Sequence, residues 1–206
     1  MALKTFVKVG NITNLSDARY CAGMGVDLLG FRMDEKSTEY IDQASYKEIV
    51  GWISGPQYVG EFESNDASTI LTTQKELKFE YIQVSDIELA NSLSTTSDVI
   101  YKVSLDNFSN DDVLKIHLSK ISDTVKFILL ESDMEVSSVV QNAINDLSSV
   151  YPILKGYGLN EQTVLSDIAT SDIKGIALKG STEVKPGFKD YDELADILEA
   201  LEDDDS

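Results

Sequence analysis

Cysteine and histidine are nearly absent from this chain of 206 residues, which has one of each. One cysteine cannot form an internal disulfide, and one cysteine with one histidine cannot build a zinc site of the common types. A chain of this length can bury about 70% of its unfolded surface, so it needs neither a disulfide nor a metal ion for stability. We therefore expect no metal and no other cofactor.

Positive charge and long apolar runs are also scarce. The chain has 17 Lys and Arg against 36 Asp and Glu, a net charge of -19. This balance argues against nucleic acid and anionic membranes as partners, because both require clustered Lys and Arg. No apolar run approaches the roughly 20 residues that span a bilayer, and Met1–Gly10 lacks the features of a signal peptide. We expect a cytoplasmic monomer or homodimer that binds a small molecule.

Proline is rare as well, with three scattered residues and no Pro/Gly/Ser-rich linker. This predicts a single domain over residues 1–201. The acidic stretch at residues 202–206 is typical of a short disordered tail.

Short β-branched and aromatic runs alternate with longer amphipathic stretches, which is typical of βα units and a parallel sheet. The expected strands are Thr5–Val9, Leu28–Arg32, Tyr58–Phe62, Tyr81–Val84, Val99–Val103, Phe127–Leu130, Ile153–Leu154 and Gly175–Leu178. The clearest helices are Leu15–Met24, Gln43–Trp52, Ala67–Lys78, Asp111–Ile121, Val136–Leu147 and Asp192–Leu201, with Asn14 and Asp66 as N-caps of the first and third. The links after the fourth and seventh strands are only weakly helical.

Eight such pairs, at about 26 residues each, favour a (β/α)8 (TIM) barrel. An open doubly wound sheet is the alternative, but it often has a glycine-rich phosphate turn after its first strand. The first turn here is Gly10-Asn11-Ile12-Thr13-Asn14, which has neither G-x-G-x-x-G nor a P-loop. The barrel is the better interpretation.

A series of short motifs runs through the chain in a fixed order. Residues 8–18 read K-V-G-N-I-T-N-L-S-D-A, and residues 25–31 read G-V-D-L-L-G-F. Further motifs are Lys36-Ser37, Val59-Gly60 with Phe62, Gln83-Val84, Gly158-Leu159-Asn160, Glu183 with Pro186-Gly187, and Lys189-Asp190. Together they resemble the phosphoribosylanthranilate isomerase family over essentially the whole chain.

The resemblance implies a (β/α)8 barrel and descent from an enzyme of tryptophan biosynthesis. The family reaction is an Amadori rearrangement of N-(5'-phosphoribosyl)anthranilate, which opens a ribose ring and moves a proton from C2 of the sugar. Such chemistry needs a general acid near the ring oxygen and a general base near the carbon. The phosphate and the carboxylate of the substrate both need donors.

The chain departs from the family at the catalytic positions. The resemblance places the family's general base, a cysteine, at Gly10, and losing a general base typically costs about 10²–10⁴ in rate. It places the general acid, an aspartate, at Glu131, whose carboxyl is one methylene further out. It places the arginine that holds the anthranilate carboxylate at Glu39, which reverses the charge.

The phosphate of a ligand would bind in the loops after the seventh and eighth strands. Gly158, Gly180 and Ser181 could offer backbone N–H groups, and Lys179 could add positive charge. The alternative is that these are ordinary loop residues. Tyr157 also replaces a glycine of the family motif.

Several charged residues are expected to point into the barrel mouth. They are Lys8, Arg32, Lys102, Lys155 and Lys179, together with Glu39, Glu61 and Glu131. They could form a new charged-ligand site, or ion pairs that fill a disused pocket, since unpaired buried charge is costly. Away from the mouth, we expect Cys21 to be a small buried hydrophobe, Trp52 to pack between helix and barrel, and His117 to be solvated.

Three functional hypotheses remain open. The chain is a family member with weak or lost isomerase activity, kept for a binding or regulatory role. Alternatively, it is a working isomerase with a rebuilt site, in which Glu131 is the acid and a carboxylate such as Glu61 is the base. A third possibility is a non-catalytic protein whose acidic surface docks a basic partner.

Overall fold

The computed structural model describes residues 2–63, 66–108, 110–180, 183–185, 188–189 and 192–203. The barrel strands are β1 (Phe6–Gly10), β2 (Leu28–Arg32), β3 (Gln57–Glu61), β4 (Tyr81–Val84), β5 (Asp98–Ser104), β6 (Phe127–Glu131), β7 (Ile153–Gly156) and β8 (Gly175–Lys179). The helices are α1 (Leu15–Gly23), α2 (Gln43–Val50), α3 (Ala67–Leu77), α4 (Ile87–Leu93), α5 (Asp111–Leu118), α6 (Ser138–Ser148), α7 (Val164–Ala169) and α8 (Asp192–Ala200), with a 3-10 turn at Leu105–Asn107.

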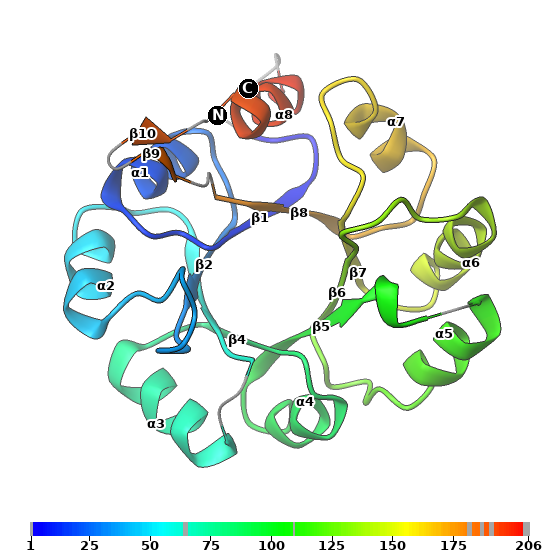
Figure 1. Cartoon of the computed structure of the whole chain (residues 1–206), viewed down its shortest axis with the longest axis horizontal. Coiled ribbons are helices and arrows are strands. Elements are labelled where there is room, and N and C mark those ends of the chain that lie inside the picture. The colour runs from blue at the N-terminus through cyan, green and yellow to red at the C-terminus, as the bar shows by residue number, and fades with distance from the viewer. Residues whose placement is uncertain are drawn as a thin grey trace.

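The eight strands form a closed parallel barrel in chain order, and β8 pairs with β1 to complete it. The helices form a ring around the strands (Figure 1). The predicted (β/α)8 barrel is confirmed, and the open doubly wound alternative is wrong. The weakly helical links after the fourth and seventh strands are the short helices α4 and α7.

Local sequence explains several helix starts. The side chain of Asn14 accepts a hydrogen bond from the backbone of Asp17, and that of Asp66 accepts from Ser68 and Thr69, so both predicted N-caps are confirmed. Ser137 caps α6 through the backbone N–H of Val140, which starts this helix later than the apolar pattern predicted. A side-chain oxygen at the N-cap satisfies backbone donors that the helix itself cannot.

The barrel interior has two layers, because alternate residues of each strand point inward. The lower layer is apolar, and its members are Phe6, Leu28, Val59, Tyr81, Ile100, Phe127, Leu129, Leu154 and Ala177. Two residues further along β1 and β3, the same inward positions hold Lys8 and Glu61. The alternation therefore places an apolar floor beneath a charged upper layer at the carboxyl ends of the strands.

A second, larger apolar cluster lies between the strands and the helices. Cys21 belongs to it and is fully buried, as predicted, and burial raises the pKa of its thiol to about 12. Trp52 does not belong to it. The helix α2 ends at Val50, and Trp52 lies beyond that end with 67% of its surface exposed, so its predicted packing role is wrong.

His117 is not a solvated surface residue either. Its Nε2 lies 2.7 Å from the hydroxyl of Tyr101, and its ring contacts the ring of Phe108 edge-on. Burial lowers the pKa of His117. The polar sequence around this residue concealed that α5 turns it toward β5.

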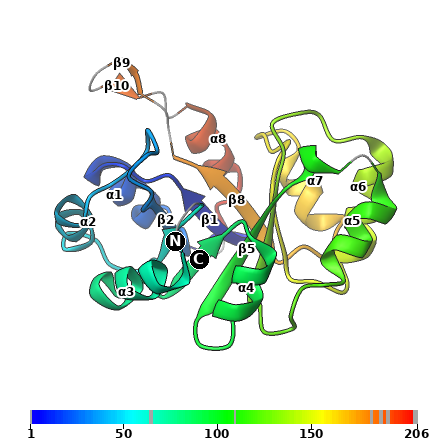
Figure 2. The same ribbon diagram turned by 60° about the horizontal axis from the view of Figure 1, so that its bottom comes forward.

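Two features lie outside the eight βα units. The strands β9 (Glu183–Lys185) and β10 (Phe188–Lys189) form an antiparallel pair that projects beyond β8 and α8 (Figure 2). The backbone of Glu202 bridges to Leu3, and the N–H of Asp203 donates to the carbonyl of Ala2. These two residues of the expected tail are thus held to the N-terminal segment, and residues 204–206 lie outside the described residues.

Barrel closure depends on a close approach at Gly175, where a Cβ atom would lie 2.1 Å from the carbonyl oxygen of Phe6. We expect Gly175→Ala to lower the free energy of unfolding by about 1–3 kcal/mol, because the clash is with backbone that cannot move aside. The matched control is Gly23→Ala at the exposed end of α1, where a Cβ would meet nothing within 4 Å. Urea denaturation of both variants is the measurement, and an equal effect at the two positions would contradict this account of closure.

Candidate functional site

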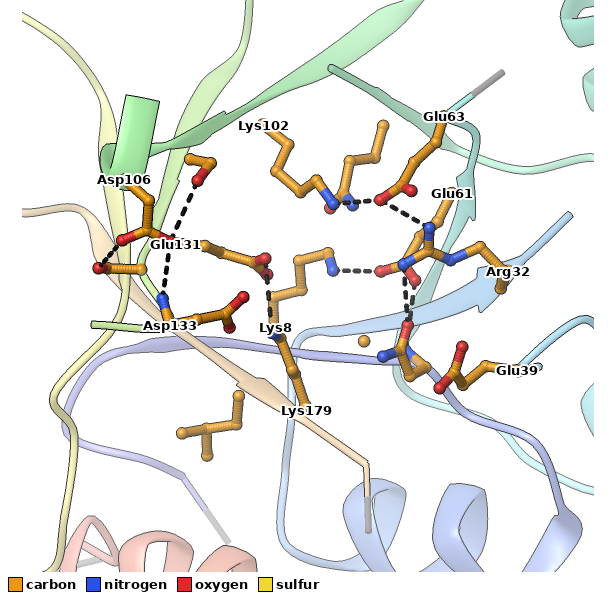
Figure 3. Close-up of a pocket in the computed structure, with 16 residues that line it drawn as sticks. Lys8, Arg32, Glu39, Glu61, Glu63, Lys102, Asp106, Glu131, Asp133 and Lys179 are labelled. Carbon is orange, nitrogen blue, oxygen red and sulfur yellow. Dashed lines mark hydrogen bonds and ion pairs between the residues drawn. The ribbon is translucent and has the colours of Figure 1, made fainter. Parts of the chain in front are cut away.

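A polar cavity of about 310 Å³ opens at the carboxyl ends of the strands, and we call it the mouth. Active sites of this fold lie at the same end. Strand residues lining the mouth include Lys8, Gly10, Arg32, Glu61, Gln83, Lys102, Ser104, Glu131 and Lys179. The predicted positions Gly10, Glu39 and Glu131 all line this cavity. Figure 3 shows Glu39 and Glu131 with the other charged residues of the mouth.

The deepest charged groups of the mouth are Lys8 and Glu61. The Lys8 ammonium lies 2.5 Å from Oε1 of Glu61, and both side chains are only 2% exposed. Burial by itself would raise the pKa of Glu61, but the Lys8 ammonium and the nearby Arg32 outweigh it, so that pKa is lowered. Glu61 is therefore a carboxylate at neutral pH, held in place by its cationic neighbour.

This ion pair occupies the space beside Gly10. A Cβ atom on Gly10 would lie 2.6 Å from Oε1 of Glu61 and 3.0 Å from Nζ of Lys8. A Cβ on Gly30 would lie 2.1 Å from the same carboxylate oxygen. The two glycines and the ion pair fit together, because a side chain at either position would displace Glu61.

The next residue, Asn11, contacts both Glu61 of the ion pair and Arg32. Its φ of 55° lies in the left-handed region, which asparagine tolerates better than most residues. The backbone N–H of Asn11 donates to Oε2 of Glu61 at 3.3 Å, and its side-chain oxygen accepts from Arg32 at 3.4 Å. Both carboxylate oxygens of Glu61 are thus occupied.

A second charged group extends outward from this pair. Glu63 accepts from Arg32 at 2.7 Å and also pairs with Lys102. Burial would raise the pKa of Glu63, but hydrogen bonds from the two cations outweigh it and lower that pKa. We call Lys8, Arg32, Glu61, Glu63 and Lys102 the ion-pair cluster; it contains three cations and two carboxylates.

The outer part of the mouth is acidic. Its four carboxylates, called here the outer carboxylates, are Glu39, Asp106, Glu131 and Asp133. Glu131 lies 3.6 Å from Lys179, which is 54% exposed. Glu39 accepts from the hydroxyl of Ser37, and Asp106 accepts from the hydroxyl of Ser132. Of these four carboxylates, only Glu131 pairs with a cation among the described residues.

The predicted phosphate-binding residues are less favourably arranged. The N–H of Gly180 donates to the carbonyl of Gly10 at 2.7 Å and is therefore used within the barrel. Gly158 has a φ of 59° and lines a smaller cavity with Lys179 and the acidic Glu193. Ser181 lies outside the described residues.

Two side chains near the carboxyl end of β7 point away from the mouth. Lys155 is directed to the outer side of β7, where it pairs with Asp167 of α7 at 2.9 Å. Its prediction as a mouth residue is wrong, because its neighbour Leu154 takes the inward position. Tyr157 is buried in the outer core and donates to Gln141, so it does not cover the mouth.

Sequence analysis missed three acidic residues of the mouth, namely Glu63, Asp106 and Asp133. Each lies two residues beyond the end of a strand, β3, β5 and β6 respectively. Asp106 lies in the 3-10 turn at Leu105–Asn107, and Glu63 and Asp133 lie in loops. Strand alternation does not fix side-chain direction there, so the sequence carried no signal for these residues.

A closed parallel barrel with a polar cavity at the strand carboxyl ends places this protein in the (β/α)8 class, in which active sites lie at this end. A family model described as N-(5'-phosphoribosyl)anthranilate (PRA) isomerase matches residues 7–200. The chain belongs to this family, which confirms the resemblance that the sequence motifs indicated.

Relatives named N-(5'-phosphoribosyl)anthranilate isomerase are similar over almost their whole length. The protein from Chloroherpeton thalassium is 24% identical, with 92% of this chain and 91% of the relative covered. That from Pelodictyon phaeoclathratiforme is 26% identical, with 96% and 97% covered.

Solved isomerase structures share the fold. The structure from Thermotoga maritima is 23% identical with a TM-score of 0.77, and 96% of this chain and 98% of that chain are covered. Another, solved in complex with reduced 1-(o-carboxyphenylamino)-1-deoxyribulose 5-phosphate, is 24% identical with a TM-score of 0.76 and the same coverage. That isomerase thus binds a phosphorylated ligand.

Neither a metal cluster nor a membrane span is found in the described part of the chain. No group of three or more His, Cys, Asp or Glu side chains there could hold a metal ion. No helix among the described residues is long and apolar enough to cross a bilayer.

The buried ion pair can be tested by removing one partner. We expect Lys8→Met to lower the free energy of unfolding by about 3–5 kcal/mol, because it leaves the Glu61 carboxylate buried without its cation. The double variant Lys8→Met with Glu61→Leu should recover a large part of the loss. Lys115→Met, which removes an exposed partner of Asp111, is the control and should change little. A Lys8→Met variant as stable as the control would contradict the role of the pair.

Acid titration gives a separate test. Since the folded-state pKa of Glu61 is lowered from 4.5, its contribution to stability is fully present above pH 4.5 and is lost as the pH falls through the folded value. Below pH 4.5 the free energy of unfolding should therefore fall more steeply in the wild type than in Glu61→Gln. Denaturant titrations of both proteins across this range measure the difference, and parallel curves would show that Glu61 is not stabilised as a carboxylate.

Proposed function

We propose that this member of the isomerase family carries out the family reaction weakly or not at all, and that its mouth serves as a binding site for a small polar molecule. The observation that carries the proposal is the buried Lys8–Glu61 pair, which fills the space beside Gly10, where the resemblance places the family's catalytic cysteine. A glycine cannot accept a proton, and both oxygens of the nearby carboxylate are already hydrogen-bonded.

The other substrate-binding positions support the same conclusion. Glu39 stands where the resemblance places the arginine for the substrate carboxylate, and two carboxylates at this position would repel each other. At the candidate phosphate position, the N–H of Gly180 is already used and Glu193 adds negative charge. Both anionic groups of the family substrate would thus meet unfavourable surroundings.

A second candidate function is a working isomerase with a rebuilt site. It is favoured by the place of Glu61, whose Oε1 lies 2.6 Å from the position of a Cβ on residue 10. In this scheme Glu61 takes over as base, Glu131 is the acid, and a phosphorylated ligand binds near Gly158 and Lys179. Against it stands the burial of Glu61, which is 2% exposed, and its lowered pKa, which weakens it as a base.

An activity assay on N-(5'-phosphoribosyl)anthranilate separates the two candidates. Relative to the Thermotoga maritima isomerase, we expect kcat/KM to be lower by at least about 100-fold, since a general base typically contributes 10²–10⁴. The protein should also fail to support growth of a tryptophan auxotroph that lacks this enzyme. Activity within tenfold of the relative, abolished by Glu61→Gln, would establish the rebuilt isomerase instead.

Restoring the thiol tests the steric part of the proposal. Gly10→Cys alone should not gain activity, because its Cβ would collide with Glu61 and Lys8. Gly10→Cys combined with Glu61→Ala makes room for the thiol and should be more active than Gly10→Cys alone. Family-level activity in the single variant would show that the ion pair does not block this position.

A further inference from the structure

The charges of the mouth are unevenly distributed between its deep and outer parts. In Figure 3 the carboxylates of Glu61 and Glu63 are each joined to cations of the ion-pair cluster, whereas Asp106, Glu131 and Asp133 lie across the cavity from that cluster. Among the described residues that line the mouth, Lys179 is the one cation outside the ion-pair cluster, against four outer carboxylates. The outer mouth therefore carries a net negative charge.

Hydrogen bonds from neutral hydroxyl groups hold two of these carboxylates, Glu39 and Asp106, without cancelling their charge. The Ser132 hydroxyl lowers the pKa of Asp106, and the Ser37 hydroxyl lowers the pKa of Glu39. Both groups are thus anionic at neutral pH. A ligand with a positive charge would be attracted to this part of the mouth, and a dianionic phosphate would be repelled.

An independent feature of the mouth also points to a ligand. Gln83 extends inward from β4, lines the cavity and is only 4% exposed. Its buried Oε1 has no hydrogen-bond partner among the described residues. Buried amide groups in proteins are almost always hydrogen-bonded, so this oxygen calls for an N–H or O–H donor.

The neighbouring Arg32 offers a hydrogen-bond donor, whereas Gln83 offers an acceptor. Its terminal nitrogens are bonded to Glu63 and Asn11, but its buried Nε has no partner among the residues described. A hydroxyl group can both donate and accept a hydrogen bond. Hydroxyl groups on a ligand would therefore suit the unmet donor and acceptor of this wall.

We infer that the mouth binds a small hydroxylated amine, of the size and chemistry of an amino sugar, in preference to a phosphorylated sugar. This inference rests on the proposed binding role of the mouth and names the class of ligand. The ammonium group lies among the outer carboxylates, and a hydroxyl or amine hydrogen reaches Gln83. The cavity, with a volume of about 310 Å³, is large enough to hold a molecule of this size.

The test is an NMR titration of the full chain with three probes of similar size: D-glucosamine as the cation, D-glucose as the neutral analogue and ribose 5-phosphate as the anion. We expect D-glucosamine to bind at least tenfold more tightly than either other probe and to shift amides at the carboxyl ends of β3, β4 and β6. The binding should weaken at high salt, as expected for attraction between charges.

Two variants assign the binding to the proposed groups. Gln83→Leu should weaken D-glucosamine binding at least tenfold without lowering the unfolding temperature, because it removes a buried amide oxygen that has no partner among the described residues. Asp133→Asn should weaken it severalfold. The matched control is Asp98→Asn, which removes the same charge from the exposed start of β5 at the opposite end of the barrel and should leave binding unchanged.

The possible results distinguish this inference from the proposed function. Absence of D-glucosamine binding, tighter binding of ribose 5-phosphate, or an equal effect of Asp133→Asn and Asp98→Asn would overturn the inference. Isomerase turnover at the family rate would overturn the proposed function, and it is measured separately on N-(5'-phosphoribosyl)anthranilate. Amine binding without such turnover supports both.

Discussion

The buried pair of Lys8 and Glu61 is the interaction on which the character of the mouth depends. Two opposite charges, each 2% exposed, lie on the apolar floor of the barrel. Neither charge could remain there alone, because burying an unpaired ion is very unfavourable. The pair in turn requires glycine at positions 10 and 30, because the Glu61 carboxylate of β3 fills the space beside both glycines.

This arrangement shows how a barrel can keep its fold while its site changes. The outer cluster packs helices against strands, and the inner apolar layer fills the barrel below the mouth. Neither layer contains Glu39, Glu131 or Lys179, so those positions can change with little effect on the core. Deeper in the barrel, a substitution at one position requires fitting residues at the positions in contact with it. Gly10, Gly30, Lys8 and Glu61 form such a set.

The fold could be predicted well from the sequence because its signals are local and repeated. The strands Leu28–Arg32 and Tyr81–Val84 were predicted with their observed bounds, and most other boundaries differ by one to three residues. The inward direction of Lys8 followed from strand alternation. Strand alternation does not predict contacts that depend on where a strand ends. Lys155 was therefore placed on the wrong side of β7. The ion pair of Glu63 with Lys102 was missed for the same reason. The packing of His117 against Tyr101 depends on how α5 is rotated, which a polar sequence does not reveal.

If no group beside Gly10 is free to move the substrate proton, the proton-transfer step itself must be slow. A single-turnover experiment, with the protein in excess over N-(5'-phosphoribosyl)anthranilate, measures this step without interference from product release. We expect product formation at least about 100-fold slower than with the Thermotoga maritima isomerase under the same conditions. A comparable rate that disappears in Glu61→Gln would contradict this expectation, because the buried carboxylate would then be the working base.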